Sequence, residues 1–343
     1  MKFYSQVNTR FFIFLFSLFS FFACGTVERP SKPSATGRAG ELLVVMEQNQ
    51  WDRQPGEMVR NIFQQNIPMF LQPEPMFDIV RIDQKSFVKL FETHRHILFA
   101  DVSAEHARPT IEVQRDVWSY PQMVIRVKAP NDSAFQAVME RNEEAFLDYY
   151  IGMERERLIN AYKRMTNHAA RSAVERVFDI SMVVPEGYYV AVEGENFIWL
   201  RRTGTREDLD MGVLIASLPY KDPAIDFDHA TIRARRDSLT RMYIPGQFDG
   251  SFMTTYPELD PEFREINFNG LYALEARSLW RVEGDFMGGP FINYTLVDEK
   301  TNRLFIFDGF VYAPKFDKRD YLRQVMAVMY SVQFPENDVL SDK

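Results

Sequence analysis

The sequence contains a single cysteine, Cys24, among its 343 residues. One cysteine excludes an intramolecular disulfide and every metal or iron–sulfur site that needs several cysteine ligands. Basic residues are also too few for a nucleic-acid surface, because 40 Lys and Arg stand against 48 Asp and Glu and leave a net charge of −8. Phosphate-cradle, dinucleotide, serine-hydrolase and zinc-protease motifs are absent as well. We therefore expect no nucleic-acid partner and no cofactor.

Long hydrophobic runs are missing beyond the start of the chain, so no later segment is predicted to cross a membrane. Phe11–Ala23 is apolar and uncharged, follows a basic start and is shorter than a membrane-spanning helix. Residues 1–23 therefore predict a signal peptide. Cys24 comes next and precedes a glycine, which resembles a bacterial lipobox, in which the cysteine is acylated and becomes the new N-terminus. That resemblance implies lipid attachment at Cys24.

Residues 24–40 are rich in proline, serine and glycine and contain no aromatic side chain. This composition predicts a flexible tether. Its only acidic residue is Glu28, whereas lipoproteins sent to the outer cell surface in one bacterial lineage carry an acidic cluster directly after the cysteine. We therefore expect a cell-envelope protein that is held to the membrane by its N-terminal lipid, on the periplasmic face of the outer membrane.

The rest of the chain alternates strand-like and helix-like patterns. It predicts an α+β fold with two mixed or antiparallel sheets, helices packed on them and a long helix that joins them. The predicted parts are an N-terminal α+β subdomain at 41–130, a long connecting helix at 131–176, a C-terminal sandwich-like α+β subdomain at 177–335, and a tail at 336–343.

Four finer expectations follow from the same patterns. The N-terminal subdomain is predicted to have the element order β-α-β-α-β-β-β, with helices on one side of its sheet. The connecting helix keeps a three/four apolar spacing from Phe135 to Met165, and Gly152 offers a place for a bend. Ile180–Val184 is predicted to be the first strand of the C-terminal subdomain. Asp317 is predicted to begin the last helix.

Several strings in the chain resemble a known family. They are Pro73–Phe77 (PEPMF), Phe197–Arg201 (FIWLR), Gly284–Phe291 (GDFMGGPF) and Val311–Lys315 (VYAPK). They are similar to an uncharacterised envelope lipoprotein family of the Bacteroidetes, domain of unknown function 4837. The resemblance implies an exported lipoprotein and supplies no activity. The element order over residues 178–335 also resembles the α-β-α sandwich of the PsbP and Mog1 type, which implies a fold and not a function.

The predicted strand Leu271–Glu283 carries the most informative polar pattern. Alternation places Glu275, Arg277, Arg281 and Glu283 on one face, and Asp285 follows in the next turn. One interpretation is a solvated face of cross-strand ion pairs. The other is a ligand-binding face on which the two arginines receive the anionic group of a peptide terminus, a glycan or a lipid headgroup.

Two histidines, His94 and His96, have a spacing that would suit metal ligands on one face of a strand. They have no acidic or cysteine partner nearby in the sequence. We therefore predict that they do not form a metal site.

The predicted function is that of a non-catalytic binding or assembly factor of the cell envelope, with an envelope protein, a glycan or a peptide as its ligand. The alternative is an envelope hydrolase that cleaves glycan or peptide with paired carboxylates among Glu275, Glu283 and Asp285. A buried carboxylate pair in a deep polar pocket would favour the enzyme. A broad surface would favour the binding protein.

Overall fold

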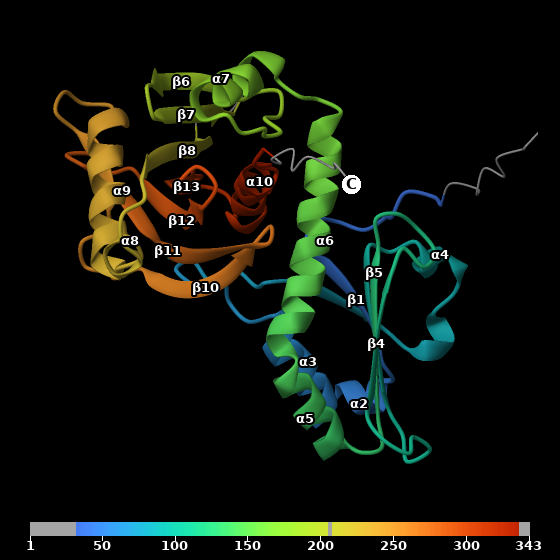
Figure 1. Cartoon of the computed structure of the whole chain (residues 1–343). Coiled ribbons are helices and arrows are strands. Elements are labelled where there is room, and N and C mark those ends of the chain that lie inside the picture. Colours follow the sequence, from blue (N-terminus) through green and yellow to red (C-terminus); the bar gives the residue numbers. More distant parts are fainter. Residues whose placement is uncertain (1–31, 205–207, 336–343) are drawn as a thin grey trace, which may run out of the picture.

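The computed structural model describes residues 32–204 and 208–335. Cys24, the predicted signal peptide, the first part of the tether and the predicted tail lie outside these ranges. The described residues form a five-stranded and an eight-stranded sheet with helices packed on them, which confirms the predicted α+β class. Figure 1 shows the two sheets on either side of helix α6 (Glu143–Lys163). No helix in the described ranges is long and apolar enough to cross a membrane.

The N-terminal sheet has the strand order β2-β1-β3-β5-β4. Its strands are β1 (Glu41–Val45), β2 (Asp78–Ile82), β3 (His96–Val102), β4 (Thr110–Arg115) and β5 (Met123–Ala129). All neighbours are parallel except β4, which pairs antiparallel with β5, so the sheet is mixed as predicted. Between these strands lie α2 (Gln48–Trp51), α3 (Gln54–Phe63), η1 (Gln84–Ser86) and α4 (Lys89–Glu92), which gives the predicted element order.

Both faces of this sheet are covered, so the expectation of helices on one side is wrong. The larger core lies under α3, α5 (Asp132–Arg141) and α6, and it includes Phe63, Phe146 and Tyr150. On the other face Phe87 and Phe91, from the η1–α4 region, pack on Leu43, Val45, Ile97 and Val124. Parallel strands are buried on both faces as a rule, because their polar backbones and apolar side chains need cover on each side.

The predicted long connecting helix is also wrong, because three helices occupy this segment: α5, α6 and α7 (His168–Phe178). Asn142 leaves helical geometry between α5 and α6 and donates its side-chain amide to the Val138 carbonyl. Asn167 caps α7 by accepting a hydrogen bond from the Ala170 N–H. Asparagine competes for backbone hydrogen bonds and favours such breaks. Gly152 lies inside α6, which continues through it.

The C-terminal sheet is antiparallel throughout, with the order β10-β11-β12-β13-β8-β7-β6 and with β9 beside β11. Its strands are β6 (Tyr189–Gly194), β7 (Phe197–Thr203), β8 (Asp210–Pro219), β9 (Phe252–Thr255), β10 (Glu262–Phe268), β11 (Leu271–Glu283), β12 (Gly288–Asp298) and β13 (Arg303–Tyr312). The helices of this half are α7, α8 (Pro223–Asp226), α9 (His229–Tyr243) and α10 (Arg319–Tyr330).

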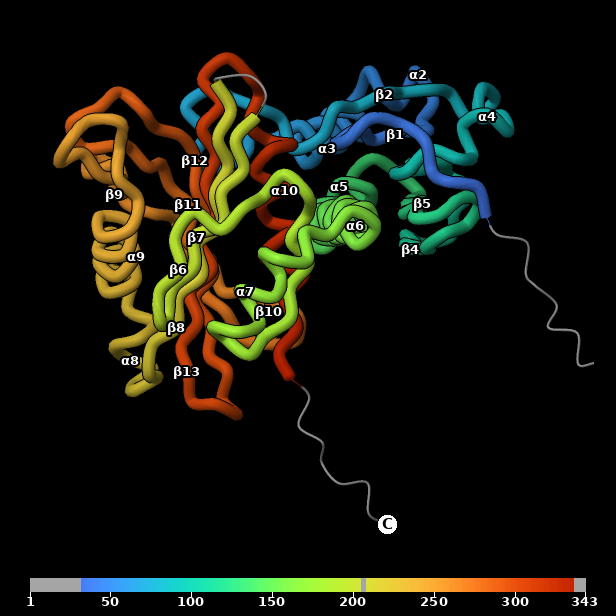
Figure 2. Tube along the Cα trace, turned by 90° about the horizontal axis from the view of Figure 1, so that it is seen from above, coloured from blue at the N-terminus to red at the C-terminus, as the bar shows by residue number. Residues whose placement is uncertain are grey.

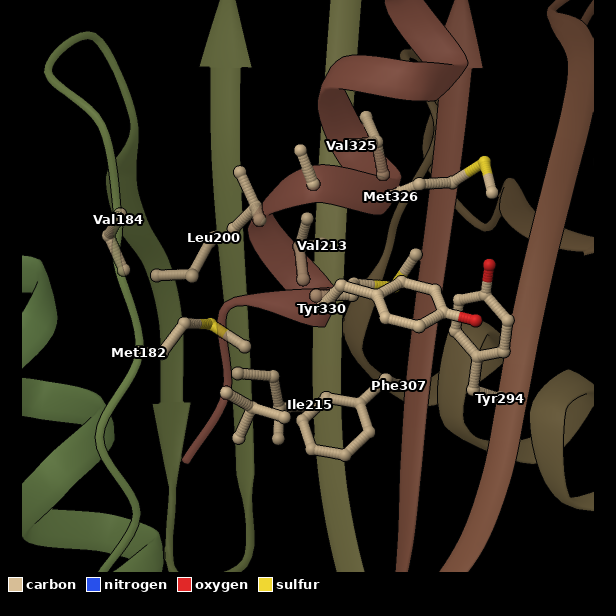
Figure 3. Close-up of a cluster of buried hydrophobic side chains, with 14 of the residues drawn as sticks. Met182, Val184, Leu200, Val213, Ile215, Tyr294, Phe307, Val325, Met326 and Tyr330 are labelled. Carbon is tan, nitrogen blue, oxygen red and sulfur yellow. The ribbon is translucent and has the colours of Figure 1, made fainter. Parts of the chain in front are cut away.

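Helices cover both faces of the eight-stranded sheet. On one face α7 and α10 enclose the largest core, part of which Figure 3 shows around Tyr294, Phe307 and Tyr330. On the other face α9 covers a second core that includes Trp199 and Trp280. The predicted strand Ile180–Val184 forms no ladder with the sheet, although Met182 and Val184 are buried in the first core. Its one bridge joins Ser181 to Gln333.

The last helix begins differently from the prediction. Lys318 precedes α10, and neither it nor Asp317 provides a side-chain cap. The cap comes from the N-terminal half, because the Glu74 carboxylate accepts hydrogen bonds from the N–H groups of Lys318 and Arg319 at 2.7–2.9 Å. A carboxylate at this position also interacts favourably with the positive end of the helix dipole.

Candidate functional site

The two halves meet where α10 packs against α6, and Figure 2 shows this helix pair between the two sheets. The segment around Glu74, in the N-terminal half, forms hydrogen bonds to α10 at this contact. Besides capping α10, it offers the Pro75 carbonyl to Arg319 at 3.1 Å and the Met76 carbonyl to Arg323 at 2.6 Å. Arg319 also reaches Asp78 on β2 at 2.9 Å. Three residues of the PEPMF string therefore bond to α10 and add to the α6–α10 contact between the two halves.

A buried group of charges lies beside this joint. Glu154, on α6, accepts hydrogen bonds from Arg95 at 2.9 and 3.1 Å and from His96 Nε2 at 2.7 Å. Burial raises the pKa of Glu154, but the bonds from His96 and Arg95 outweigh that effect and lower it to about 2. Burial also lowers the pKa of His96, whose Nδ1 has no partner. A neutral imidazole with its proton on Nε2 fits this arrangement.

The structure also shows the hydrogen-bond partners of the two histidines, His94 and His96. His94 contacts Glu41 through Nε2 at 2.8 Å, and His96 contacts Glu154, so each has an acidic partner that is remote in the sequence. No group of three or more His, Cys, Asp or Glu side chains in the described residues is arranged to hold a metal ion. These histidines act as hydrogen-bonding groups within the N-terminal half.

A cavity of about 720 Å³ opens between the halves, and we call it the interdomain cavity. It is lined by α6 and the end of α5, by β10 with the middle of β11, and by α10. The predicted site residues Glu275 and Arg277 line it. Part of the predicted binding face therefore borders a real cavity.

Glu275 and Arg277 form a tight ion pair in this wall. Arg277 donates through Nε to one carboxylate oxygen of Glu275 at 2.7 Å and through Nη2 to the other at 3.3 Å. Burial raises the pKa of Glu275, which is only 4% exposed, but the charges of Arg277 and Arg264 hold it below its usual value. Glu275 is therefore an ionised counterion of Arg277. The interpretation of this strand face as solvated is wrong at Glu275, because its side chain is buried.

Arg281, Glu283 and Asp285 lie apart from the cavity, which corrects the grouping of five residues into one site. Arg281 pairs with Glu283 at 2.7 Å, and Asp285 stands in the turn after β11. The reason is that β10 pairs with the first half of β11 and β9 with the second half, from Trp280 to Glu283. One long strand thus contributes to two separate regions.

Arg264 is the residue that sequence reasoning missed. It lies on β10 directly across from Glu275, its Nε is 3.9 Å from the Glu275 carboxylate, and its side chain is 50% exposed at the cavity. The signal was present in Asn269-Gly270, a pair that favours a tight hairpin turn. Both residues have positive φ, 53° and 91°, and the turn sets the register that brings Arg264 to Glu275.

A wider groove of about 2130 Å³ continues along the other end of α6. It runs between α6, α7, the β10–β11 turn and the residues after α10. In its lining, the Arg155 guanidinium stacks on the ring of Tyr330 at 3.6 Å. The volume exceeds that of ordinary small-molecule pockets, ~300–1,000 Å³, so an extended ligand fits it better than a compact one.

Fold and cavity together define a two-part α+β protein with a cavity between its parts. Residues 167–331 match a family model described as Domain of unknown function (DUF4837), which confirms the predicted resemblance for this part of the chain. Residues 35–163 match a second model, Domain of unknown function (DUF8532). The break between the models falls in the α6–α7 connection. A comparison with curated proteins gives no match.

Solved structures show only distant likeness. A crystal structure from Bacteroides thetaiotaomicron has a TM-score of 0.27 and 8% identity, and the match covers 46% of this chain and 46% of that one. A mutant of Mog1 has a TM-score of 0.30 and 10% identity, over 46% and 92% of the two chains. The Saccharomyces cerevisiae Ran-binding protein Mog1p has a TM-score of 0.28 and 10% identity, and the match covers 45% of this chain and 89% of that one. TM-scores this low support no inference about function.

Proposed function

We propose that the protein is a lipid-anchored, periplasm-facing binding or assembly protein of the cell envelope, which holds an anionic ligand group in the interdomain cavity without catalysis. The location rests on the sequence: the apolar run Phe11–Ala23, the single Cys24 after it and the tether that follows. The binding role rests on the cavity.

The observation that carries the binding role is the pair of arginines in one cavity wall. Arg277 uses Nε and Nη2 on Glu275, which leaves Nη1 without a partner in the described residues. Arg264 makes no closer contact than 3.9 Å to the same carboxylate. Glu275 and Glu262 line the same wall and balance its formal charge, while two guanidinium groups face the cavity. Charge-assisted bonds from such groups to a carboxylate or phosphate are strong and directional.

The first test uses a small anionic probe. We expect acetyl-Ala-norleucine-Ala with a free carboxylate to bind, and its C-terminal amide to bind much more weakly, in isothermal titration calorimetry. Arg264→Ala should weaken binding of the carboxylate peptide roughly ten- to hundredfold, because it removes bonds worth ~1.5–3 kcal/mol. Arg281→Ala is the matched control, since Arg281 lies on the same sheet but outside the cavity. Equal losses in both variants would contradict the assigned site.

A second test concerns the anchor. Cys24→Ala should leave an unprocessed precursor that no longer incorporates labelled fatty acid, because the acylated thiol is gone. The measurement is metabolic labelling with a fatty acid, followed by comparison of the labelled band with total protein. Wild type and variant labelled to the same extent would refute lipid attachment at Cys24.

The alternative function is hydrolysis by paired carboxylates, and one observation favours it. Asp148 and Glu275 line the same cavity, and partial burial raises the pKa of Asp148 while Arg277 lowers that of Glu275. Such opposed shifts divide the roles of acid and base in glycosidases. Both oxygens of Glu275 are held by Arg277, however, which makes Glu275 a weak base. Binding is therefore the function that the geometry supports better.

A further inference from the structure

The segment that precedes β1 is hydrogen-bonded to the N-terminal half from Pro33 onwards. The N–H of Ala35 donates to the Tyr120 carbonyl at 3.1 Å, and the N–H of Tyr120 donates to the Pro33 carbonyl at 2.9 Å. Further along, the N–H of Thr36 donates at 2.7 Å to the carbonyl of Thr93, the residue that follows α4. The described end of the predicted tether therefore lies on the N-terminal half, beside α4.

This docking limits the distance between the N-terminal half and a lipid attached to Cys24. Lys32, the first residue that the structure describes, comes eight residues after Cys24. Eight residues span at most about 28 Å even when the chain is fully extended. With the anchor on Cys24, the place where the described chain begins must therefore lie near the membrane surface. Figure 1 shows α4 beside that place.

Exposed apolar side chains lie at α4. Phe87 and Phe91 pack on the N-terminal sheet, whereas Val88 and Leu90 are 54% and 76% exposed. Apolar side chains of this size gain free energy when they leave water for an apolar environment. Single exposed apolar residues are common on protein surfaces. This pair gains its meaning from its position, because it lies on the part of the molecule that the anchor brings towards the lipid.

Two exposed lysines, Lys85 and Lys89, accompany the apolar pair. The acidic neighbours are less available, since Asp83 accepts a hydrogen bond from Arg81 at 2.8 Å and Glu92 is half-buried. A lysine can lay its methylene stem along apolar surface and keep its ammonium group among lipid phosphates. This part of the surface, which we call the α4 tip, consists of Lys85, Val88, Lys89 and Leu90.

We infer that the α4 tip is a second membrane contact, in which Val88 and Leu90 enter the headgroup layer and the two lysines bind lipid phosphates. This inference rests on the proposed lipid anchor, which raises the effective concentration of the tip at the bilayer. The contact also orients the molecule. Because α4 lies on the far side of the N-terminal sheet from the C-terminal half, that half projects away from the lipid surface (Figure 1).

The test places a fluorophore at the tip of the full-length, acylated chain. Cys24 is the only cysteine, and its thiol is blocked once it carries the lipid, so Leu90→Cys introduces a single free thiol. The chain is labelled there with a polarity-sensitive fluorophore and reconstituted in vesicles of phosphatidylethanolamine and phosphatidylglycerol. We expect emission at a short wavelength, quenched by spin-labelled lipid and protected from iodide in the water. Val88→Asp in the labelled chain should return the fluorophore to water.

Leu71→Cys is the matched control. Leu71 is 77% exposed, and its neighbours Phe70 and Gln72 contact the C-terminal half. A label at this position should emit at a longer wavelength, be quenched by iodide and be insensitive to spin-labelled lipid. Both substitutions replace exposed side chains, so neither removes packing from a core.

The outcomes separate this inference from the proposed anchor. Equal emission and equal quenching at the two positions, on chains that still float with the vesicles, would overturn the membrane contact and leave the anchor standing. A short-wavelength label at Leu90→Cys that spin-labelled lipid does not quench would overturn the lipid as the occupant, in favour of a second copy of the chain. Labelling of the unsubstituted chain would show a free thiol at Cys24 and would refute the anchor together with this inference.

Discussion

Replacing Asp308 by alanine is expected to destabilise the C-terminal half by about 3–5 kcal/mol, the cost of leaving a buried charge without its partner. Asp308, on β13, is fully buried and accepts hydrogen bonds from Arg236 at 2.8 and 3.3 Å and from Asn293 at 3.0 Å. Arg236 comes from α9 and stacks on the ring of Phe291 at 3.6 Å. Without Asp308, its guanidinium would remain in the core that α9 covers.

The measurement is thermal unfolding followed by circular dichroism, with urea titration for the free energy. Asp308→Leu combined with Arg236→Met should cost much less than Asp308→Ala, because it removes both charges and keeps apolar volume. Arg176→Ala is the exposed control: its pair with Glu193 is largely in solvent, so about 0–1 kcal/mol is expected. An unfolding midpoint for Asp308→Ala equal to that of wild type would show that the pair does not hold α9 to the sheet.

The sheets were predictable because their strands carry a local pattern. Met211–Leu218 and Leu304–Tyr312 are apolar runs of strand length, and both are central strands, buried on both faces. Ile180–Val184 has the same composition and is buried too, yet it pairs with no strand ladder. Apolar composition thus predicted burial correctly but could not supply the neighbour that makes a strand.

The candidate site was only partly predictable because it depends on partners far apart in the chain. Arg277 and Glu275 were found from one strand, and the turn at Asn269-Gly270 could have added Arg264. Nothing local connects Asp148 to that strand, since the two are brought together by the packing of α6 on α10. The same holds for Glu74, whose carboxylate caps a helix that begins 245 residues later.

Helix α6 links the buried joint to the proposed site. Its residues Glu144 and Asp148 form the acidic wall of the cavity, and Glu154, further along the same helix, is held by Arg95 and His96. Because α6 continues without a break between them, the bonds at Glu154 hold the helix that carries these acidic residues against β3. A change at Glu154 should therefore affect the stability of the N-terminal half.

Glu154→Gln is expected to lower the free energy of unfolding by roughly 3 kcal/mol at pH 7. A folded-state pKa of about 2, against the ordinary value of 4.5, corresponds to about that much stability. The folded pKa is depressed, so this contribution is present above pH 4.5 and is lost as the pH falls towards 2. The variant lacks it at every pH, since glutamine keeps an acceptor oxygen but carries no charge. Wild type and variant should therefore differ at pH 7 and converge near pH 2.

His96 adds a second loss of folding stability as the pH falls. Its folded pKa is lowered by burial, so its contribution is present above pH 6.5 and declines as the pH falls below that value. Urea unfolding at a series of pH values between 7 and 2 measures both contributions together, because Glu154 raises the pKa of His96 and its replacement changes the His96 contribution as well. Glu156→Gln, on the exposed Arg115 pair, should differ from wild type by no more than about 1 kcal/mol throughout. A constant gap between wild type and Glu154→Gln down to pH 2 would mean that the ionised carboxylate of Glu154 is not what holds α6 to β3.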